Sequence, residues 1–378
     1  MATALAHAQA AVRRVAPNPG VGCVLLVDGT VVGIGTTAPP GGPHAERVAL
    51  AVAGDRARGA TACVTLEPCA HHGRTPPCTD ALIAAGVARV VIAHPDPNPI
   101  AAGGAAVLRD AGIEVVGPLD PGDPLRAAVA GQLEGFLQLV HRGRPHVTLK
   151  MAQTFDGALV APDGARWLTG PTARRAVHRW RAARDAVLVG VGTVLADDPR
   201  LDVRGMAVDH QPRAVVIDSQ LRTPPTARVV RPGTVLLTRI EAADPRAVAL
   251  TARGADVVTV APTDDGRVDL PTALHALADR GVTSVLAEPG RTLADALLAA
   301  GLVDRIVLHV ATHLGTGGWR AAAPTPPGDR WRTERVGGAG RDLIRQVVRI
   351  PDTTGPPDTT EPPGTEPPGT EPPRTTES

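Results

Sequence analysis

The chain has 378 residues, which is more than one typical domain holds, and its 43% hydrophobic content supports sizeable cores, so we expect two domains. The formal net charge of +1 excludes a global electrostatic attraction to nucleic acid or to an anionic membrane. Because the sequence has no run of 18 apolar residues and no secretory signal pattern, we predict a cytoplasmic protein without a membrane partner.

Strand and helix signals alternate along residues 1–142. Two predicted strands, 21–27 and 30–35, flank Asp28-Gly29, a dipeptide typical of a two-residue hairpin turn. A helix at 46–53, a strand at 60–66, a helix at 78–85 and a strand at 88–93 follow. This alternation predicts an α/β sheet. Residues 118–135 are interpreted as a connecting segment.

The most specific pattern in this half is His44-Ala45-Glu46, followed by Pro68-Cys69 and then Cys78. One imidazole and two thiolates are a complete ligand set for a catalytic zinc whose fourth position is open to water. Zinc lowers the pKa of bound water, and a glutamate two residues from the histidine is placed to move protons. This order of H-x-E, P-C and a second cysteine indicates a zinc deaminase.

Two simpler interpretations of the cysteines stay open. His71 or His72 would complete a structural zinc site as a fourth ligand, or the two thiols would be unrelated buried groups. A disulfide framework is disfavoured because ligand-like spacing beside H-x-E points to a metal. The other cysteines, Cys23 and Cys63, lie in apolar runs and are expected to be inert core thiols.

The strand pattern restarts at residue 146 and predicts a second α/β domain. Its expected strands are 146–153, 185–194, 213–218, 234–238, 256–261, 284–287 and 304–312. The last 26 residues carry three Thr-Glu-Pro-Pro units and no aliphatic side chain suited to a core, which predicts disorder. We therefore divide the chain into a first domain at 1–142, a second at 143–350 and a tail at 351–378.

Lys150 is the only lysine among 39 basic residues. A guanidinium does not replace a compact ammonium whose pKa shifts readily, so this position is a candidate for chemistry. A turn and a helix start at Gly290, a suitable anion site for cofactor phosphates, although a plain strand-to-helix turn is the alternative. The sequence has no G-x-G-x-x-G, which argues against a standard dinucleotide-binding domain.

The first half resembles the deaminase half of the bifunctional riboflavin-biosynthesis deaminase–reductase family. The matching segments are 17–23, 43–46, 65–69, 73–78 and 96–99. The resemblance implies a cytidine-deaminase-like three-layer domain in which His44, Cys69 and Cys78 hold zinc and Glu46 shuttles protons. It also implies a pyrimidine and ribose-phosphate pocket lined by Asn18, His71, Arg74, Asp96 and Asn98. Two departures from the family pattern are Arg47 and the segment 103–105.

The second half resembles the reductase domain of the same family, which has a dihydrofolate-reductase-like α/β fold; the matching segments are 147–157, 167–169, 189–199 and 288–294. The resemblance implies NADPH contacts from Ala152, Trp167, Thr193, Asp197, Ser219, Gly290, Arg291, Thr292, Leu293, Ala294, Asp295 and Ala296. It implies substrate contacts from Ala165, Arg181, Leu201, Arg204 and Glu288. Lys150 and Asp197 are the candidates for acid assistance. Ala165 stands where a serine is usual, and Pro289 replaces a small residue.

These observations predict a bifunctional enzyme that deaminates a phosphorylated ribosylaminopyrimidine with zinc and then reduces its ribose with NADPH. We expect a small-molecule substrate, no nucleic-acid partner and a homo-oligomer. The alternatives are a paralogue in a specialised pyrimidine or pteridine pathway, and a deaminase with an impaired reductase. A nucleic-acid base deaminase and a non-catalytic zinc scaffold are the rivals from other classes; near-neutral charge and 2% aromatic content oppose the former.

Overall fold

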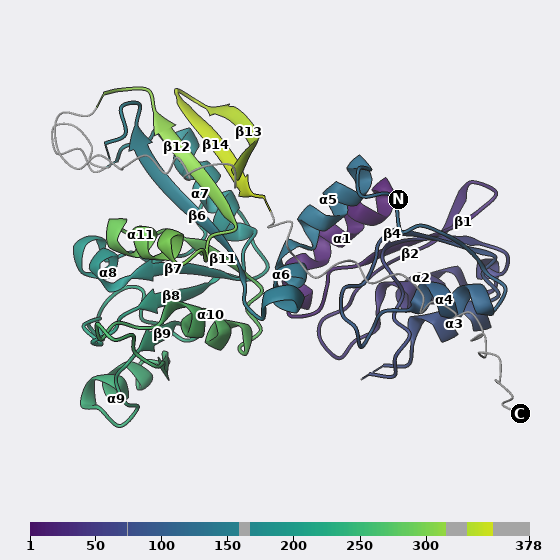
Figure 1. Cartoon of the computed structure of the whole chain (residues 1–378), viewed down its shortest axis with the longest axis horizontal. Coiled ribbons are helices and arrows are strands. Elements are labelled where there is room, and N and C mark those ends of the chain that lie inside the picture. Colours follow the sequence, from purple (N-terminus) through teal and green to yellow (C-terminus); the bar gives the residue numbers. More distant parts are fainter. Residues whose placement is uncertain (74, 159–166, 315–330, 351–378) are drawn as a thin grey trace, which may run out of the picture.

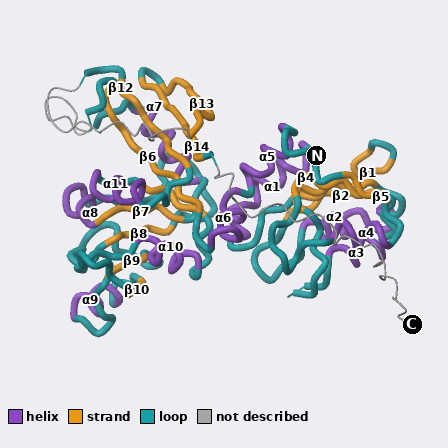
Figure 2. The backbone as a smooth tube through the Cα atoms, in the orientation of Figure 1, coloured by secondary structure: helices purple, strands orange, loops and turns teal. Residues whose placement is uncertain are grey.

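The computed structural model describes residues 1–73, 75–158, 167–314 and 331–350, and its two β-sheets lie in separate halves of the molecule (Figure 1). The first sheet has five strands in the order β2-β1-β3-β4-β5, and the second has nine in the order β10-β9-β8-β7-β11-β6-β12-β14-β13. Both sheets are mixed, since parallel strands in each are joined to antiparallel strands. Each half combines helices with one sheet of strands, as Figure 2 shows.

The first half is a three-layer arrangement. Helices α1 and α5 contact each other on one side of the sheet, while α2, α3 and α4 form a contacting row on the other (Figure 1). Its elements are α1 Ala2–Val15, β1 Gly22–Val27, β2 Thr30–Thr36, α2 Ala45–Ala53, the 3-10 turn Gly54–Ala57, β3 Thr61–Leu66, α3 Cys78–Ala84, β4 Arg89–His94, α4 Gly104–Asp110, β5 Glu114–Val116, α5 Pro124–Gln132 and α6 Glu134–Arg142.

The predicted hairpin is confirmed. Strands β1 and β2 are antiparallel, and both turn residues, Asp28 and Gly29, have positive φ values of 49° and 76°. Two consecutive residues with positive φ match the right-handed twist of the paired strands, which is why Asp-Gly is favoured there.

The second half contains seven parallel strands with an antiparallel hairpin at one edge. Two apolar clusters cover its two faces, one around Leu149 and Val285 and the other around Val187 and Val216. Its elements are β6 His146–Thr154, α7 Pro171–Ala182, β7 Ala186–Gly190, α8 Val191–Asp197, β8 Arg213–Ile217, β9 Val235–Thr238, α9 Pro245–Thr251, β10 Asp256–Thr259, α10 Leu270–Ala278, β11 Ser284–Ala287, α11 Arg291–Ala299, β12 Arg305–Ala311, β13 Trp331–Ala339 and β14 Asp342–Arg349.

Two sequence predictions of secondary structure were wrong. The expected strand at 185–194 ends at Gly190, and helix α8 begins at Val191, because an apolar run does not distinguish a strand from a buried helix. The expected connecting segment at 118–135 contains helix α5 and the start of α6. Helix α5 has an N-cap at Asp123, whose carboxylate accepts from the Leu125 amide at 2.7 Å, and a proline in its first turn.

The antiparallel hairpin of β13 and β14 was not predicted, and it turns at Gly340, where φ is +67°. Within the described ranges, no helix has the length and apolar character needed to cross a membrane. The predicted disordered tail, 351–378, lies outside the described residues.

Candidate active sites in the two domains

Three side chains predicted as metal ligands meet on one side of the first sheet. His44 is the N-cap of α2, Cys69 follows β3, and Cys78 is the first residue of α3. The His44 Nδ1 atom lies 3.6 Å from Cys69 Sγ and 3.4 Å from Cys78 Sγ, and all three ligand atoms lie within 4.8 Å of one another. Both thiols are buried.

This donor set fits zinc. Zn–S bonds of about 2.3 Å and Zn–N bonds of about 2.0 Å place tetrahedral ligands roughly 3.6 Å apart, close to the observed separations. The backbone amide of Cys78 donates to Cys69 Sγ at 3.4 Å. A hydrogen bond from the Cys78 thiol lowers the pKa of Cys69 to about 4 and raises the pKa of Cys78. The pair thus already contains one stabilised thiolate, the form that binds a metal.

Neither His71 nor His72 belongs to this group of ligand atoms among the described residues. The geometry therefore supports three protein ligands and an open fourth position, the arrangement of a catalytic rather than a structural zinc. All four cysteines are free thiols, and Cys23 is buried in the core of the first half, where burial raises its pKa.

Glu46 lies in the first turn of α2 and lines the same cavity as His44. The residue is 3% exposed, and burial raises its pKa. A carboxylate with a raised pKa accepts and returns a proton near neutral pH more readily than an ordinary surface glutamate. The helix start therefore places a proton carrier beside the three ligands.

A cavity of about 360 Å³ opens beside the three ligands. Four of the five residues predicted to bind the pyrimidine substrate line it: Asn18, His71, Asp96 and Asn98. The fifth, Arg74, lies outside the described residues. The Asp96 carboxylate accepts from the Asn98 amide at 2.9 Å, and burial raises the pKa of Asp96 to about 6. Glu67 holds this loop, since its carboxylate accepts from the Asp96 amide at 3.2 Å and the Ala105 amide at 2.9 Å.

The two departures from the family pattern in this half lie beside the ligand loops. The Arg47 guanidinium donates to the Pro77 carbonyl at 3.3 Å and so ties α2 to the residue before Cys78. Gly104 lies against the backbone after β3, where an added Cβ would come within 1.8 Å of the Pro68 carbonyl oxygen. Both positions support the ligand loops without entering the cavity.

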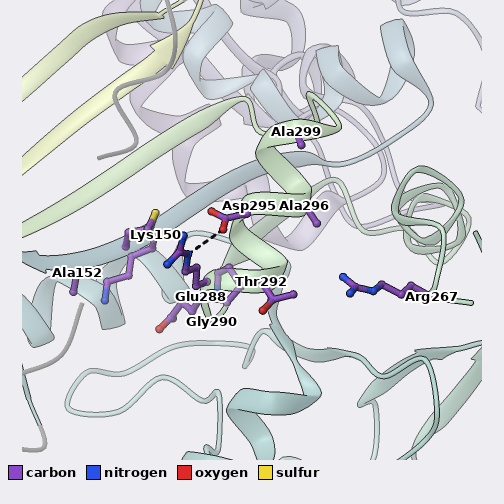
Figure 3. Close-up of a pocket in the computed structure, with 12 residues that line it drawn as sticks. Lys150, Ala152, Arg267, Glu288, Gly290, Thr292, Asp295, Ala296 and Ala299 are labelled. Atoms are coloured by element: carbon purple, nitrogen blue, oxygen red, sulfur yellow. Dashed lines mark hydrogen bonds and ion pairs between the residues drawn. The ribbon is translucent and has the colours of Figure 1, made fainter. Parts of the chain in front are cut away.

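A larger cavity, of about 980 Å³, lies at the carboxyl end of the second sheet (Figure 3). Lys150 and Ala152 from β6 line it together with Glu288 and with residues from the start of α11. A neighbouring cavity of about 800 Å³ is lined by Gly190, Ser219 and Leu293. Thr292 and Ala296 line both cavities. Helix α11 therefore presents its N-terminal turn to the space where the phosphates of a dinucleotide were predicted.

Lys150 is partly buried, and burial lowers its pKa while the charge of Glu288 opposes that change. Burial alone would raise the pKa of Glu288, but the charge and hydrogen bonds of Arg181 lower it. Arg181 also donates to the Asp202 carbonyl at 3.0 Å. Lys150 from β6, Arg181 from α7 and Glu288 after β11 thus lie close together, as predicted for one site.

The other residues predicted to bind NADPH or substrate lie on several elements of this half. Leu201 is buried, and the Arg204 amide donates to His178 Nδ1 at 3.2 Å. Asp197 is exposed at the end of α8 and is not among the described residues that line these two cavities. Trp167 is exposed, with the Arg174 guanidinium 5.2 Å from its ring centre. Thr193 lies on α8 and Ala294 on α11, whereas Arg291 and Asp295 of α11 line the larger cavity. Ala165 lies outside the described residues.

Sequence reasoning missed two residues of these sites. Phe136, from α6, lines the deaminase-type cavity. His309 is fully buried on β12 as the register partner of Ala152, and neither ring nitrogen has a hydrogen-bond partner among the described residues. Burial lowers its pKa to about 4. No local motif marks either residue, because each reaches its site through packing between distant elements.

Comparisons with known proteins match both halves. Residues 145–333 match the model of the RibD C-terminal domain, and residues 1–94 match the cytidine and deoxycytidylate deaminase zinc-binding region. The Escherichia coli riboflavin biosynthesis protein RibD is 44% identical over 83% of this chain and 87% of its own length. The corresponding Mycobacterium tuberculosis protein is 40% identical over 92% and 96%.

Solved structures of similar proteins match the chain across both halves. The Acinetobacter baumannii RibD structure has a TM-score of 0.77 at 35% identity, covering 92% of this chain and 97% of that one. A Thermotoga maritima diaminohydroxyphosphoribosylaminopyrimidine deaminase/5-amino-6-(5-phosphoribosylamino)uracil reductase has a TM-score of 0.79 at 31% identity and the same coverage.

These matches confirm the predicted two-domain α/β fold class and the paired hydrolase and oxidoreductase activities, and the prediction of zinc and NADPH agrees with the two domain types. The chain belongs to the RibD family of riboflavin biosynthesis proteins and joins a zinc deaminase domain to a reductase domain.

Proposed function

We propose that this chain hydrolyses the 2-amino group of 2,5-diamino-6-ribosylamino-4(3H)-pyrimidinone 5′-phosphate and then reduces the ribosyl chain with NADPH, giving 5-amino-6-ribitylaminouracil 5′-phosphate. The observation that carries the proposal is the meeting of His44, Cys69 and Cys78 beside a buried Glu46 in a chain that also brings Lys150 to a second cavity. The two activities for which the Thermotoga maritima relative is named fit this order.

In the deaminase domain, His44, Cys69 and Cys78 would hold zinc. When bound, zinc supplies a water acidic enough to attack an amino-substituted ring carbon at neutral pH. Glu46 would take one proton from the attacking water and deliver it to the ring nitrogen, and would then carry the remaining hydroxyl proton to the amino group, which leaves as ammonia. Asn18, Asp96 and Asn98 would orient the substrate, and Arg74 would grip its phosphate through paired hydrogen bonds.

In the reductase domain, the first turn of α11 would bind cofactor phosphates, since its free amides favour anions. When bound, NADPH supplies a hydride to ribose C1′. Lys150 donates a hydrogen bond or a proton to the sugar oxygen as the ring opens. Arg181 and Arg204 would bind the substrate phosphate, because guanidinium groups pair with phosphate at two points.

We also propose that residues 1–142 form the deaminase domain and that residues 143–350 form the reductase domain. We place the enzyme in the cytoplasm as a homo-oligomer. Sedimentation at several protein concentrations tests the assembly, and a monomeric enzyme with both activities would contradict it.

A single incubation tests the function. The purified protein is loaded with zinc and mixed with the diaminopyrimidinone nucleotide, with and without NADPH, and the products are identified by mass. We expect the deaminated nucleotide without NADPH and the ribityl product with it. Undiminished ammonia release by both Glu46→Ala and His44→Ala would rule out the zinc mechanism, and the absence of NADPH oxidation with the deaminated intermediate would rule out the reductase.

A further inference from the structure

Helix α6 joins the two domains, and its first three residues face different partners. Glu134 and Gly135 contact the reductase domain, whereas Phe136 lines the deaminase cavity. Since successive residues of a helix are rotated by about 100°, Phe136 points to nearly the opposite side from Glu134. One short helix thus touches both halves of the enzyme.

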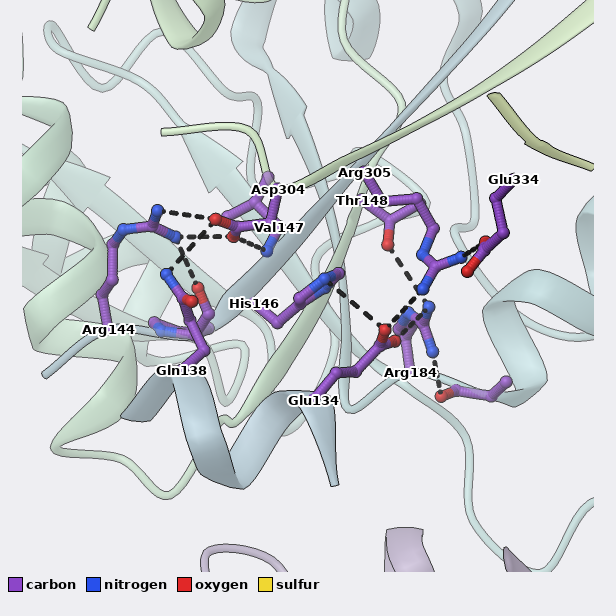
Figure 4. A network of polar contacts seen from close by, with 12 residues as sticks. Glu134, Gln138, Arg144, His146, Val147, Thr148, Arg184, Asp304, Arg305 and Glu334 are labelled. Atoms are coloured by element: carbon purple, nitrogen blue, oxygen red, sulfur yellow. Dashed lines mark hydrogen bonds and ion pairs between the residues drawn. The ribbon is translucent and has the colours of Figure 1, made fainter. Parts of the chain in front are cut away.

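The contacts of Glu134 hold the helix firmly. Its carboxylate lies 2.9 Å from Arg184, 2.7 Å from Arg305 and 3.6 Å from His146, all from the reductase domain (Figure 4). The Arg184 guanidinium also donates to the Thr148 hydroxyl at 3.3 Å. All four ionisable side chains of this cluster are less than a fifth exposed, so the contacts are little screened by water.

Two further contacts fix the position of α6. An added Cβ at Gly135 would lie 2.9 Å from the Thr283 hydroxyl, so the helix backbone lies directly against the segment before β11. One turn later, the Gln138 amide donates to Asp304 at 3.3 Å. Asp304 is itself held by Arg144 at 2.8 Å. The reductase domain therefore determines where the side chains of α6 lie.

Phe136 is the only phenylalanine, tryptophan or tyrosine among the described residues that line the deaminase cavity. The other walls come from polar residues such as Asn18 and Asp96, and from aliphatic residues, glycines and prolines, none of which offers a broad flat face. A flat pyrimidine ring gains most from an aromatic face, because bases stack favourably on aromatic side chains. The ring of Phe136 is thus the natural contact for the base of the substrate.

We propose that Phe136 is a specificity-determining residue of the deaminase site, contacting the pyrimidine ring, and that the reductase domain positions it through Glu134 and Gly135. The inference rests on the proposed deaminase function. Both domains then shape the deaminase pocket. This gives a physical reason for joining them in one chain, in addition to the order of the two reactions.

The test compares steady-state ammonia release and zinc content across four variants. Phe136→Leu keeps an apolar side chain but removes the ring, so KM for the diaminopyrimidinone nucleotide should rise roughly ten-fold or more while kcat and zinc content stay near their original values. Phe136→Tyr keeps the ring and should keep KM. Leu137→Ala is the matched control, because Leu137 packs against the same core without lining the cavity; it should lower Tm and leave KM unchanged.

Glu134→Gln tests whether the reductase domain positions Phe136. Glu134 does not line the cavity, but loss of its ion pairs should displace α6 and raise the same KM about ten-fold. If that variant does not fold, Gly135→Ala takes its place, since its added Cβ would lie 2.9 Å from the Thr283 hydroxyl and so forces α6 and that segment apart. Unchanged KM in these folded variants would overturn the role of the reductase domain.

Unchanged KM in Phe136→Leu, or an equal rise in Leu137→Ala, would overturn the role of Phe136 while the deaminase activity of the original enzyme stood. Absence of ammonia release by the original zinc-loaded enzyme would instead overturn the deaminase function and this inference with it.

Discussion

Arg181 on α7 and Glu288 after β11 form a two-point ion pair, with Nε 2.6 Å from Oε1 and Nη2 3.0 Å from Oε2. Both residues were predicted to contact substrate, and in this structure they contact each other beside Lys150. Their side chains are 12% and 15% exposed, so the pair is largely removed from water. The proposed substrate site therefore contains a preformed charged pair rather than two independent groups.

Removing one member of this pair leaves the other buried and unpaired. We expect Glu288→Gln to lower the free energy of unfolding by about 3–5 kcal/mol and to reduce reductase activity while deaminase activity remains. Urea denaturation and separate assays of the two steps measure this. Glu114→Gln is the control, because its pair with Arg89 is exposed and contributes only about 0–1 kcal/mol. An equal effect at both positions would contradict the prediction.

The lone lysine provides a direct test of residue type. Lys150→Arg keeps a positive charge but replaces a compact ammonium by a broad guanidinium, so we expect reductase kcat to fall about 10²-fold or more. The opposite exchange at a remote pair, Arg280→Lys, should leave both activities unchanged. NADPH oxidation with the deaminated nucleotide is the readout. Full activity of the Lys150→Arg enzyme would show that any cation serves there.

Loss of a thiol ligand should separate the two activities. Cys78→Ser is expected to lose most of its zinc and its ammonia release, whereas NADPH oxidation with the deaminated intermediate continues. Cys63→Ala serves as the control, since Cys63 is a free thiol outside the ligand group and should retain zinc. Metal analysis after dialysis decides the outcome, and retention of stoichiometric zinc by Cys78→Ser would exclude Cys78 as a ligand.

Glu46→Gln should have a different signature from the ligand variants. The amide cannot accept and return a proton, so deamination should fall by about 10²–10⁴ while zinc remains bound. Metal analysis and ammonia release on the same sample distinguish this result from metal loss. A variant that keeps near-normal turnover would show that another group carries the proton.

The free energy of unfolding should depend on pH through Glu134. Burial alone would raise the pKa of Glu134, but His146, Arg184 and Arg305 lower it from 4.5 to about 2. Between these values the unfolded chain binds more protons than the folded one, so stability falls as pH decreases from about 4.5 towards 2. Urea denaturation at about pH 5 and pH 3.5 should show a smaller decrease for Glu134→Gln. Parallel curves for the two proteins would contradict this prediction.

Much of the fold could be predicted from local pattern. Turn chemistry predicts the hairpin at Asp28-Gly29, and an apolar run predicts strand β6, which carries Lys150. Helix α8 could not be separated from the strand before it, because Val191 and Val194 continue an apolar run that suits either structure. Helix α5 carried the signal of an Asp-Pro start, which the interpretation of 118–135 as a connection passed over.

The sequence by itself determined the chemistry available to this protein. One histidine, one glutamate and two cysteines at short spacing specify a zinc ligand set and a proton carrier, because donor type and local helix starts depend on adjacent residues. Only the tertiary structure decided that Arg181 pairs with Glu288 and that Phe136, from α6, lines the cavity beside the three metal-ligand residues. Those relationships depend on how distant elements pack, and no short stretch of sequence contains them.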